Sequence, residues 1–395
     1  MGRTLQRPAS KAHSRIAASP LRRVAASLFS LAVLLTPVFV KAGDNPADVQ
    51  PFDFKLPLGI PRDVWSYFVP KDNPMTAEKV ALGRDLFFDK RLSVDGSVSC
   101  ATCHAPERAF TDGKRVAEGI GGRLGTRNSP TLLNAMFNTG QFWDGRAESL
   151  EAQARLPLVN PDEMGSQTYE QIIARVGGDE SYKKKFERVF GGAMTVDGMV
   201  RSIAAYERTL VAGNSPFDRY QAGDTNAMSS NARAGMILFR GKARCNVCHT
   251  INQGFGAYPF LSDGNYRNTG VAANANGFDA ASRRAMQVAG DFKPALLVEL
   301  GKQKDSHLLG RFLVSGNTLD IGAFRTPSLR NVELTAPYFH DGSAATLEDV
   351  VKFYVKGGNA NAFRDWQLEP VDLSEDEQRD LVAFLKALTS DEARQ

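Results

Sequence analysis

Long apolar runs, spare cysteines and excess charge are all scarce in this sequence. Beyond residue 42, no stretch of the 395 residues is long and apolar enough to cross a bilayer, so no membrane span is expected there. The first 42 residues contain seven Lys and Arg and no Asp or Glu, which leaves 41 basic and 44 acidic residues in the rest of the chain. This near balance does not indicate nucleic acid binding. With four cysteines and five histidines, the chain has few side chains that could hold a metal.

The four cysteines all belong to two C-x-x-C-H motifs: Cys100, Cys103 and His104, then Cys245, Cys248 and His249. This spacing is typical of covalent c-type haem attachment, in which two thiols bond to one porphyrin and the histidine becomes the proximal iron ligand. Two disulfides or two halves of zinc sites are the alternatives. Because both motifs end in histidine and together use every cysteine, the sequence predicts two c-type haems and therefore redox chemistry.

The first 42 residues are typical of a secretory signal. A basic stretch over residues 1–23 precedes an apolar run from Val24 to Val40, which is short for a membrane span and is interrupted by Pro37. Small residues up to Ala42 suit a signal peptidase, so we expect cleavage before Gly43 and export to the periplasm. An uncleaved anchor helix is the alternative. Export also fits c-type haem attachment.

An internal repeat divides the rest of the chain into two similar halves. Three segments recur 197 residues later: Ser129–Asn134 as Thr326–Asn331, Phe142–Gly145 as Phe339–Gly342, and Leu150–Glu151 as Leu347–Glu348. About 350 residues also exceed the usual size of a single core. We therefore predict a mainly α protein of two fused cytochrome c-like domains, 43–224 and 225–395, related by internal duplication.

Helices are expected around both haem motifs. Gly83–Phe87 and Gly235–Phe239 are similar segments that each predict a helix leading to a motif. Val196–Leu210 and Ser374–Leu388 are amphipathic, and the second begins with the Ser-x-x-Glu pattern of a capping box.

The ligands opposite the proximal histidines decide between electron transfer and chemistry at iron. No histidine lies between His104 and His249, so candidate ligands for the first haem are few. Tyr354 falls two turns into a predicted helix, and its counterpart 197 residues earlier is Pro157, which cannot bind iron. If this position covers the haem in each half, the second haem can be capped by a phenolate and the first haem stays open. A core role for Tyr354 is one alternative. A methionine ligand is the other, from Met164, Met228, Met236 or Met286.

Several motifs resemble the bacterial dihaem cytochrome c peroxidase superfamily over residues 75–360: Phe142–Ala147, Leu150–Ala154, Asn160–Met164 and Pro337–Ser343. In typical members a distal histidine closes the peroxidatic haem and a methionine closes the other. Neither is found here, and Tyr354 stands where the methionine would fall. The sequence is similar instead to the MauG-type branch. This resemblance implies a His/Tyr second haem and a permanently open first haem, which together store two oxidising equivalents.

The resemblance also implies roles for individual residues. It identifies Trp143 as a charge relay between the haems, and Gln153, Glu163 and Pro157 as residues of the distal pocket. Glu163 would move a proton between the oxygens of peroxide, and Gln153 would donate a hydrogen bond there. By pattern alone, Glu163 could be an ordinary loop carboxylate and Trp143 a core aromatic. A phenolate from Tyr354 would favour oxidised iron.

A calcium site between the domains is a further implication, with Asn128 and the backbone carbonyls of Thr335 and Pro337 as oxygen ligands. One departure concerns the residue two positions before the second motif. MauG has a surface tryptophan there that oxidises its protein substrate, whereas this chain has Ala243. A role in maturing methylamine dehydrogenase is therefore not expected.

Two classes of function remain. The first is an enzyme that reduces hydrogen peroxide with electrons from a small periplasmic donor, a cytochrome c or copper protein, or from an oxidisable protein. The second is a dihaem electron carrier with no catalysis of its own. We favour the enzyme, because the first haem has no candidate histidine to close it.

Overall fold

The structure is a computed structural model that describes residues 52–251, 260–289, 294–391 and 393. The predicted secretory signal, residues 1–42, and its cleavage point lie outside the described residues. Among the residues that are described, no helix is both long enough and apolar enough to cross a membrane.

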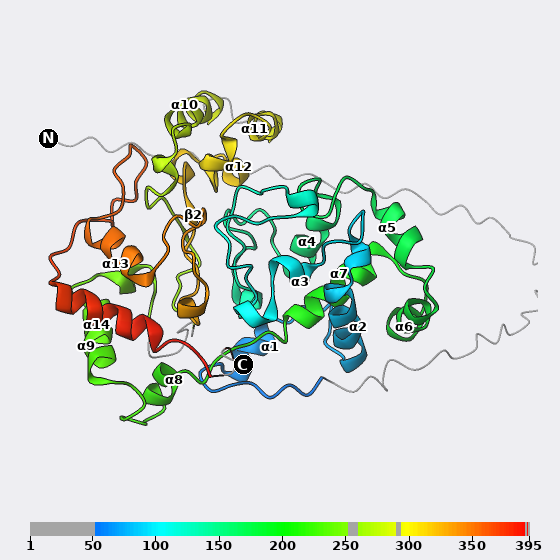
Figure 1. The fold of residues 1–395 in the computed structure, drawn as a ribbon, viewed down its shortest axis with the longest axis horizontal. Helices are drawn as coiled ribbons and strands as arrows, with labels where there is room; N and C mark the ends of the chain where they lie inside the picture. Colours follow the sequence, from blue (N-terminus) through cyan, green and yellow to red (C-terminus); the bar gives the residue numbers. More distant parts are fainter. Residues whose placement is uncertain (1–51, 252–259, 290–293, 392, 394–395) are drawn as a thin grey trace, which may run out of the picture. The chain divides into compact units, whose positions relative to one another are not determined.

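Helices dominate both halves of the described chain (Figure 1). The first half contains α1 (Arg62–Tyr67), α2 (Ala77–Phe88), α3 (Cys100–Cys103), α4 (Leu150–Arg155), α5 (Tyr169–Val176), α6 (Glu180–Phe190), α7 (Val196–Glu207) and α8 (Pro216–Gln221). The second contains α9 (Ser230–Arg240), α10 (Phe278–Ala289), α11 (Pro294–Gly301), α12 (Phe312–Ser315), α13 (Leu347–Val355) and α14 (Glu375–Lys386). Two short antiparallel strands, β1 (Tyr266–Arg267) and β2 (Phe324–Arg325), pair Tyr266 with Arg325. The predicted mainly α fold class is confirmed.

Hydroxyl side chains mark the starts of the main helices. The side-chain oxygens before α2, α7 and α9 each accept a hydrogen bond from the backbone N–H three residues on: Thr76, Thr195 and Ser229. The predicted capping box of α14 is present, because Ser374 Oγ accepts from the Glu377 N–H at 3.2 Å and the Glu377 carboxylate accepts from the Ser374 N–H at 2.8 Å. Helix α7 begins as predicted but ends at Glu207, three residues before Leu210.

The same helix crossing occurs once in each half. Helix α2 crosses α7 in the first half, and α9 crosses α14 in the second. A Cβ atom added to Gly83 would lie 1.8 Å from the Ser202 carbonyl oxygen, and one added to Gly235 would lie 1.9 Å from the Asp380 carbonyl oxygen. Only glycine permits so close an approach of two backbones. The matched glycines of the two sequence segments therefore form matched helix contacts, as an internal duplication requires.

Backbone angles repeat the 197-residue offset. Three pairs of equivalent residues share a positive φ: Asn134 and Asn331 (62° and 61°), Phe142 and Phe339 (64° and 71°), and Gly145 and Gly342 (69° and 62°). Positive φ is uncommon for residues other than glycine. The recurrence of this unusual backbone at one constant offset shows that the same local structure was built twice.

Three hydrophobic clusters form the core. The first joins α2, α6 and α7 through Leu86, Phe186 and Ile203, and the second joins α9 and α14 through Phe239 and Phe384. A third, around α10 and α12, has no counterpart among the described residues of the first half, yet it includes Trp143 from that half. Phe217 of α8 packs in the second cluster. The predicted boundary at residues 224 and 225 remains a proposal.

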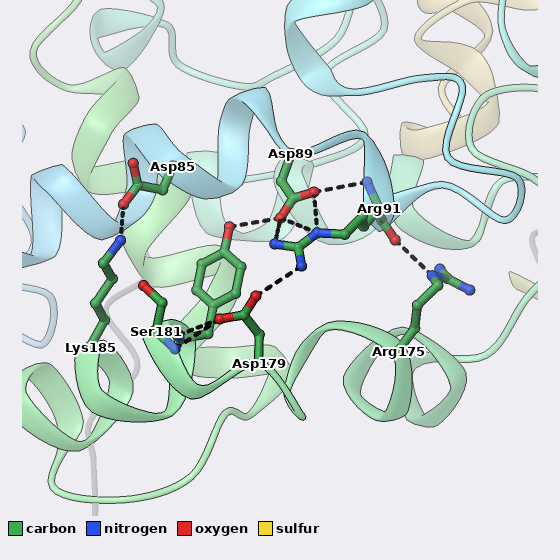
Figure 2. A network of polar contacts seen from close by, with 8 residues as sticks. Asp85, Asp89, Arg91, Arg175, Asp179, Ser181 and Lys185 are labelled. Carbon is green, nitrogen blue, oxygen red and sulfur yellow. Dashed lines mark hydrogen bonds and ion pairs between the residues drawn. The ribbon is translucent and has the colours of Figure 1, made fainter.

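A polar network fixes α6 against the end of α2 (Figure 2). The Asp89 carboxylate accepts hydrogen bonds from Arg91 Nη2 at 2.7 Å and from the Tyr182 hydroxyl at 2.9 Å. Arg91 also pairs with Asp179 at 3.0 Å. Burial raises the pKa of Asp89, but the hydrogen bonds from Arg91 and Tyr182 outweigh burial and hold this pKa below its usual value. The network therefore stabilises the first half while Asp89 is ionised.

Candidate functional site

A cavity of about 240 Å³ lies at the second C-x-x-C-H motif. Cys245, Cys248 and His249 line it, and Tyr354 reaches it from α13. Most of the remaining wall near the motif is apolar, with side chains from α13, α14 and the loop before them: Leu329, Val332, Leu347, Val350 and Leu385. A mainly apolar cavity that contains the motif histidine, both motif thiols and the Tyr354 phenol fits a covalently attached haem.

Both motif histidines are held in the orientation that iron ligation requires. His249 Nδ1 lies 2.8 Å from the Leu261 carbonyl oxygen, and His104 Nδ1 lies 3.1 Å from the Phe110 carbonyl oxygen. A carbonyl only accepts, so Nδ1 carries the hydrogen and Nε2 keeps its lone pair. Burial lowers the pKa of both imidazoles, which keeps them neutral. Leu261 and Phe110 both have positive φ. In both halves, therefore, the carbonyl of a positive-φ residue orients the motif histidine.

The four motif cysteines are unpaired thiols. Among the described residues, no group of three or more His, Cys, Asp or Glu side chains is placed to hold a metal ion. Both findings disfavour the alternatives of disulfides and of zinc. Free thiols beside an oriented, neutral imidazole are the donor set that c-type haem attachment needs.

None of the four methionine alternatives lines the cavity. Met164 is buried in the first hydrophobic cluster, and Met228 and Met236 are buried in the second. Met286 on α10 is 48% exposed. Tyr354, by contrast, lines the same cavity as His249, and burial raises the pKa of its phenol. Of the predicted candidates for the second iron, Tyr354 is therefore the one that the described structure brings to the motif.

The first half differs at the position equivalent to Tyr354. Helix α4 ends at Arg155, and Pro157 begins a 3₁₀ turn that runs to Val159. Proline has no N–H to continue an α-helix, which explains why α13 continues over its corresponding residues and α4 does not. Gln153 lies in the last turn of α4 and is partly buried. No side chain able to bind iron therefore occupies the place of Tyr354.

Glu163 lies in the loop after this turn and close to the first motif. Its charge acts on the thiols of Cys100 and Cys103. Its Oε1 atom accepts a hydrogen bond of 2.9 Å from the Asn160 side-chain amide, and its carbonyl accepts one of 2.9 Å from the Ile120 N–H. Burial raises the pKa of Glu163, and the Arg146 guanidinium offsets part of that rise. A positioned carboxyl with a raised pKa is a candidate for proton transfer.

Trp143 lies at the junction of the two halves. Its indole Nε1 donates to the Asn128 carbonyl at 2.9 Å, and its side chain lines the cavity of the second motif. The Asn128 N–H donates to the His340 carbonyl at 2.9 Å, and the Arg325 N–H donates to the Trp143 carbonyl at 2.7 Å. Asn128 corresponds to Arg325, and Trp143 to His340, at the 197-residue offset. The halves thus exchange equivalent hydrogen bonds across a pseudo-twofold junction.

The predicted calcium residues, Asn128, Thr335 and Pro337, all line the cavity of the second motif. The Asn128 amide donates to the Lys114 carbonyl at 2.9 Å, which leaves its side-chain oxygen as an acceptor. One amide oxygen and two backbone carbonyls are ligands that suit a hard cation.

Sequence reasoning missed some of the groups at these sites. The 197-residue offset could have identified Arg325 as the counterpart of Asn128. No sequence pattern distinguishes Glu207, which is buried on α7 and whose Oε2 has no hydrogen-bond partner in the described part of the chain. Burial raises its pKa to about 8, and its charge acts on the Cys100 thiol. The carbonyls of Phe110 and Leu261 depend on loop conformation, which the sequence does not reveal.

Comparison with known proteins gives consistent matches. Residues 77–226 match the family described as di-haem cytochrome c peroxidase. The chain is 37% identical over 342 residues to the methylamine utilization protein MauG of Methylorubrum extorquens, covering 86% of this chain and 84% of that protein. It is 40% identical over 329 residues to the cytochrome-c peroxidase IdrP1 of Denitromonas iodatirespirans, covering 82% and 85%.

Among solved structures, a MauG-like protein associated with microbial copper homeostasis superposes with a TM-score of 0.70 at 33% identity, covering 87% of this chain and 97% of that one. The fold, the paired C-x-x-C-H motifs and these relatives agree on a peroxidase-like oxidoreductase with two c-type haems. This chain belongs to the dihaem cytochrome c peroxidase family, in its MauG-like branch.

Proposed function

We propose that this protein is an exported enzyme that reduces hydrogen peroxide at an open first haem and shares the oxidising equivalents with a second, closed haem. The observation that carries this proposal is the asymmetry between the halves. Tyr354 lines the cavity with His249, whereas the equivalent Pro157 can offer no ligand. A dihaem carrier would gain nothing from one closed and one open site, but a peroxide-reducing enzyme needs both.

When bound, the haems supply the iron at which peroxide reacts and the two centres that hold the oxidising equivalents. The protein contributes position and charge. Cys100 and Cys103 attach the first haem, and Cys245 and Cys248 the second. His104 and His249 present Nε2 because the carbonyls of Phe110 and Leu261 hold Nδ1–H.

On the open side, Glu163 is the group that moves a proton. Its carboxyl would take a proton from the peroxide oxygen on the haem side and return it to the other oxygen, so that water can leave. The raised pKa that burial gives Glu163 suits both directions of this transfer. Gln153, in the last turn of α4, would donate a hydrogen bond in the same pocket, and Pro157 would form part of its wall.

On the closed side, we propose Tyr354 as the second ligand of the iron held by His249. A phenolate is a hard, anionic ligand and stabilises oxidised iron, which suits a centre that stores an oxidising equivalent. Trp143 donates a hydrogen bond to the first-half residue Asn128 and lines the cavity of the second motif, which supports a role in relaying charge. A calcium ion bound by Asn128, Thr335 and Pro337 would stabilise the same junction.

The names of the relatives do not identify the electron donor, so we propose only its chemical class. Their names describe a cytochrome-c peroxidase, a methylamine utilization protein and a protein of copper homeostasis. We propose a small periplasmic cytochrome c or copper protein, or an oxidisable protein, as the electron source. Ala243 occupies the place of the MauG surface tryptophan, so maturation of methylamine dehydrogenase is not part of the proposal.

Mixing the ferric protein carrying both haems with hydrogen peroxide tests the function directly. The proposal predicts rapid changes in the optical signals of both haems and consumption of peroxide when a reduced cytochrome c is supplied. A protein that carries two haems but leaves both spectra and the peroxide concentration unchanged would instead be an electron carrier.

A further inference from the structure

Among the described residues, Arg325 is a buried cation at the junction with no acidic partner. Its side chain is 7% exposed and lines the cavity of the second motif. Nη1 donates to the Asn138 side-chain oxygen at 2.8 Å and Nε to the Phe142 carbonyl at 3.5 Å. Within the described residues Nη2 makes no hydrogen bond, and the charged group that acts on Arg325 is the Tyr266 phenol, not a carboxylate. A buried guanidinium is costly unless an anion is bound beside it.

The internal repeat explains what this cation replaces. At the 197-residue offset, Arg325 corresponds to Asn128, and Asn138 corresponds to Thr335. The contact between Arg325 and Asn138 therefore takes the place, in the repeat, of the proposed calcium site at Asn128 and Thr335. One side of the junction offers neutral oxygen ligands to a cation. The other side carries a guanidinium in the equivalent place.

A second, partly buried arginine provides a contrast. Arg127 stacks over the Phe324 ring at 4.7 Å and donates to the His307 carbonyl, but it does not line the cavity. Burial lowers the pKa of both Arg127 and Arg325 to about 10. Both guanidiniums therefore lose contact with water, and they differ in access to the haem cavity.

We propose that Arg325 is the resident cation on its side of the junction and that it binds a carboxylate side chain of a haem through its guanidinium. The inference rests on the proposed binding of two haems. Because the cavity encloses the second motif, the second haem is the expected source of the carboxylate, and the first haem is the other source of the same chemistry. The bound arginine neutralises that carboxylate and thereby raises the reduction potential of the haem that carries it.

The test compares three variants of the full chain: Arg325→Gln, Arg325→Lys and Arg127→Gln. Haem content is measured first, because two attached haems per chain are required before any result bears on Arg325. Each haem is then titrated spectroelectrochemically through its own high-spin or low-spin signal, and resonance Raman spectroscopy follows the bending mode of the haem carboxylates.

For Arg325→Gln we expect the ratio of ferric to ferrous second haem to rise about tenfold at a fixed potential, about 59 mV for a one-electron couple. The carboxylate mode should shift as well. Arg325→Lys should leave the reduction potential close to that of the unsubstituted protein, because the positive charge remains. It should still shift the carboxylate bending mode, because a compact ammonium replaces a planar guanidinium that can donate two hydrogen bonds. Arg127→Gln should leave the mode unchanged. A change confined to the signals of the first haem would assign the carboxylate to that haem.

Unchanged potentials and an unchanged mode in Arg325→Gln would overturn the proposal, as would an equal effect of Arg127→Gln on the carboxylate mode. If Arg325→Gln does not fold, the mode in Arg325→Lys decides the question. Failure to attach two haems in the unsubstituted protein would instead refute the proposed function.

Discussion

The substitution Glu163→Gln separates the chemical role of this carboxyl from a packing role. Glutamine keeps the shape of the side chain and an oxygen that can accept the 2.9 Å hydrogen bond from Asn160. It cannot take up and return a proton. Because a general acid–base group contributes about 10²–10⁴-fold, the reaction with peroxide should slow by that factor. At about 1.36 kcal/mol per tenfold, this is roughly 3–5 kcal/mol of barrier.

The same substitution should not destabilise the fold. Burial raises the pKa of Glu163 in the folded protein, so ionising it costs stability once the pH exceeds the pKa of the unfolded chain. Glutamine removes that cost. We therefore expect the free energy of unfolding at neutral pH to stay equal or rise, and both haem spectra to stay unchanged.

Stopped-flow mixing with peroxide measures the effect, and Asp162→Asn is the matched control. Asp162 is an exposed carboxylate of the same loop, and its charge is the smallest of the causes that act on the Glu163 pKa. Its substitution should therefore leave the rate within about twofold, the scale of a surface change. A Glu163→Gln protein that reacts within a few-fold of the unsubstituted rate would refute proton transfer by Glu163. Water held by Gln153 would then be the next candidate.

Three further substitutions and one control substitution test other parts of the account. Tyr354→Phe should keep both haems attached and abolish the original low-spin signal, as followed by electron paramagnetic resonance; an unchanged signal would show that Tyr354 is not a ligand. Gly235→Ala should lower the free energy of unfolding by about 1–3 kcal/mol in denaturant titration, because the new methyl meets a carbonyl of α14 at 1.9 Å. Asp89→Asn should cost about 1–3 kcal/mol at pH 7 by loss of the arginine contact in Figure 2, and the difference should shrink as the pH falls through the carboxyl range. Asp85→Asn, whose ion pair is largely exposed, should cost about 0–1 kcal/mol in the same assay.

The repeated architecture could be predicted because duplication leaves signals in both sequence and backbone. The motifs at Phe142 and Phe339 share an offset and, in the structure, a positive φ. Gly83 and Gly235 mark the two helix crossings for a physical reason, since neither position has room for a side chain. Helix α7 was predicted three residues too long because periodicity does not show where the chain turns.

The candidate site was only partly predictable. The motif residues and Tyr354 could be placed because their spacing is tied to haem attachment and to the repeat. The acceptors of the two histidines could not, since they are backbone carbonyls of Phe110 and Leu261 and carry no side-chain signature. Helices α10 and α12, which cover Trp143, belong to a segment without a counterpart in the first half, so the offset gave no guide to it.

The most direct test of the central claim is the electron paramagnetic resonance spectrum of the resting ferric protein with both haems attached, recorded without prior reduction. The account predicts one high-spin haem, open beside Pro157, and one low-spin haem, closed by Tyr354. Two low-spin haems would contradict it.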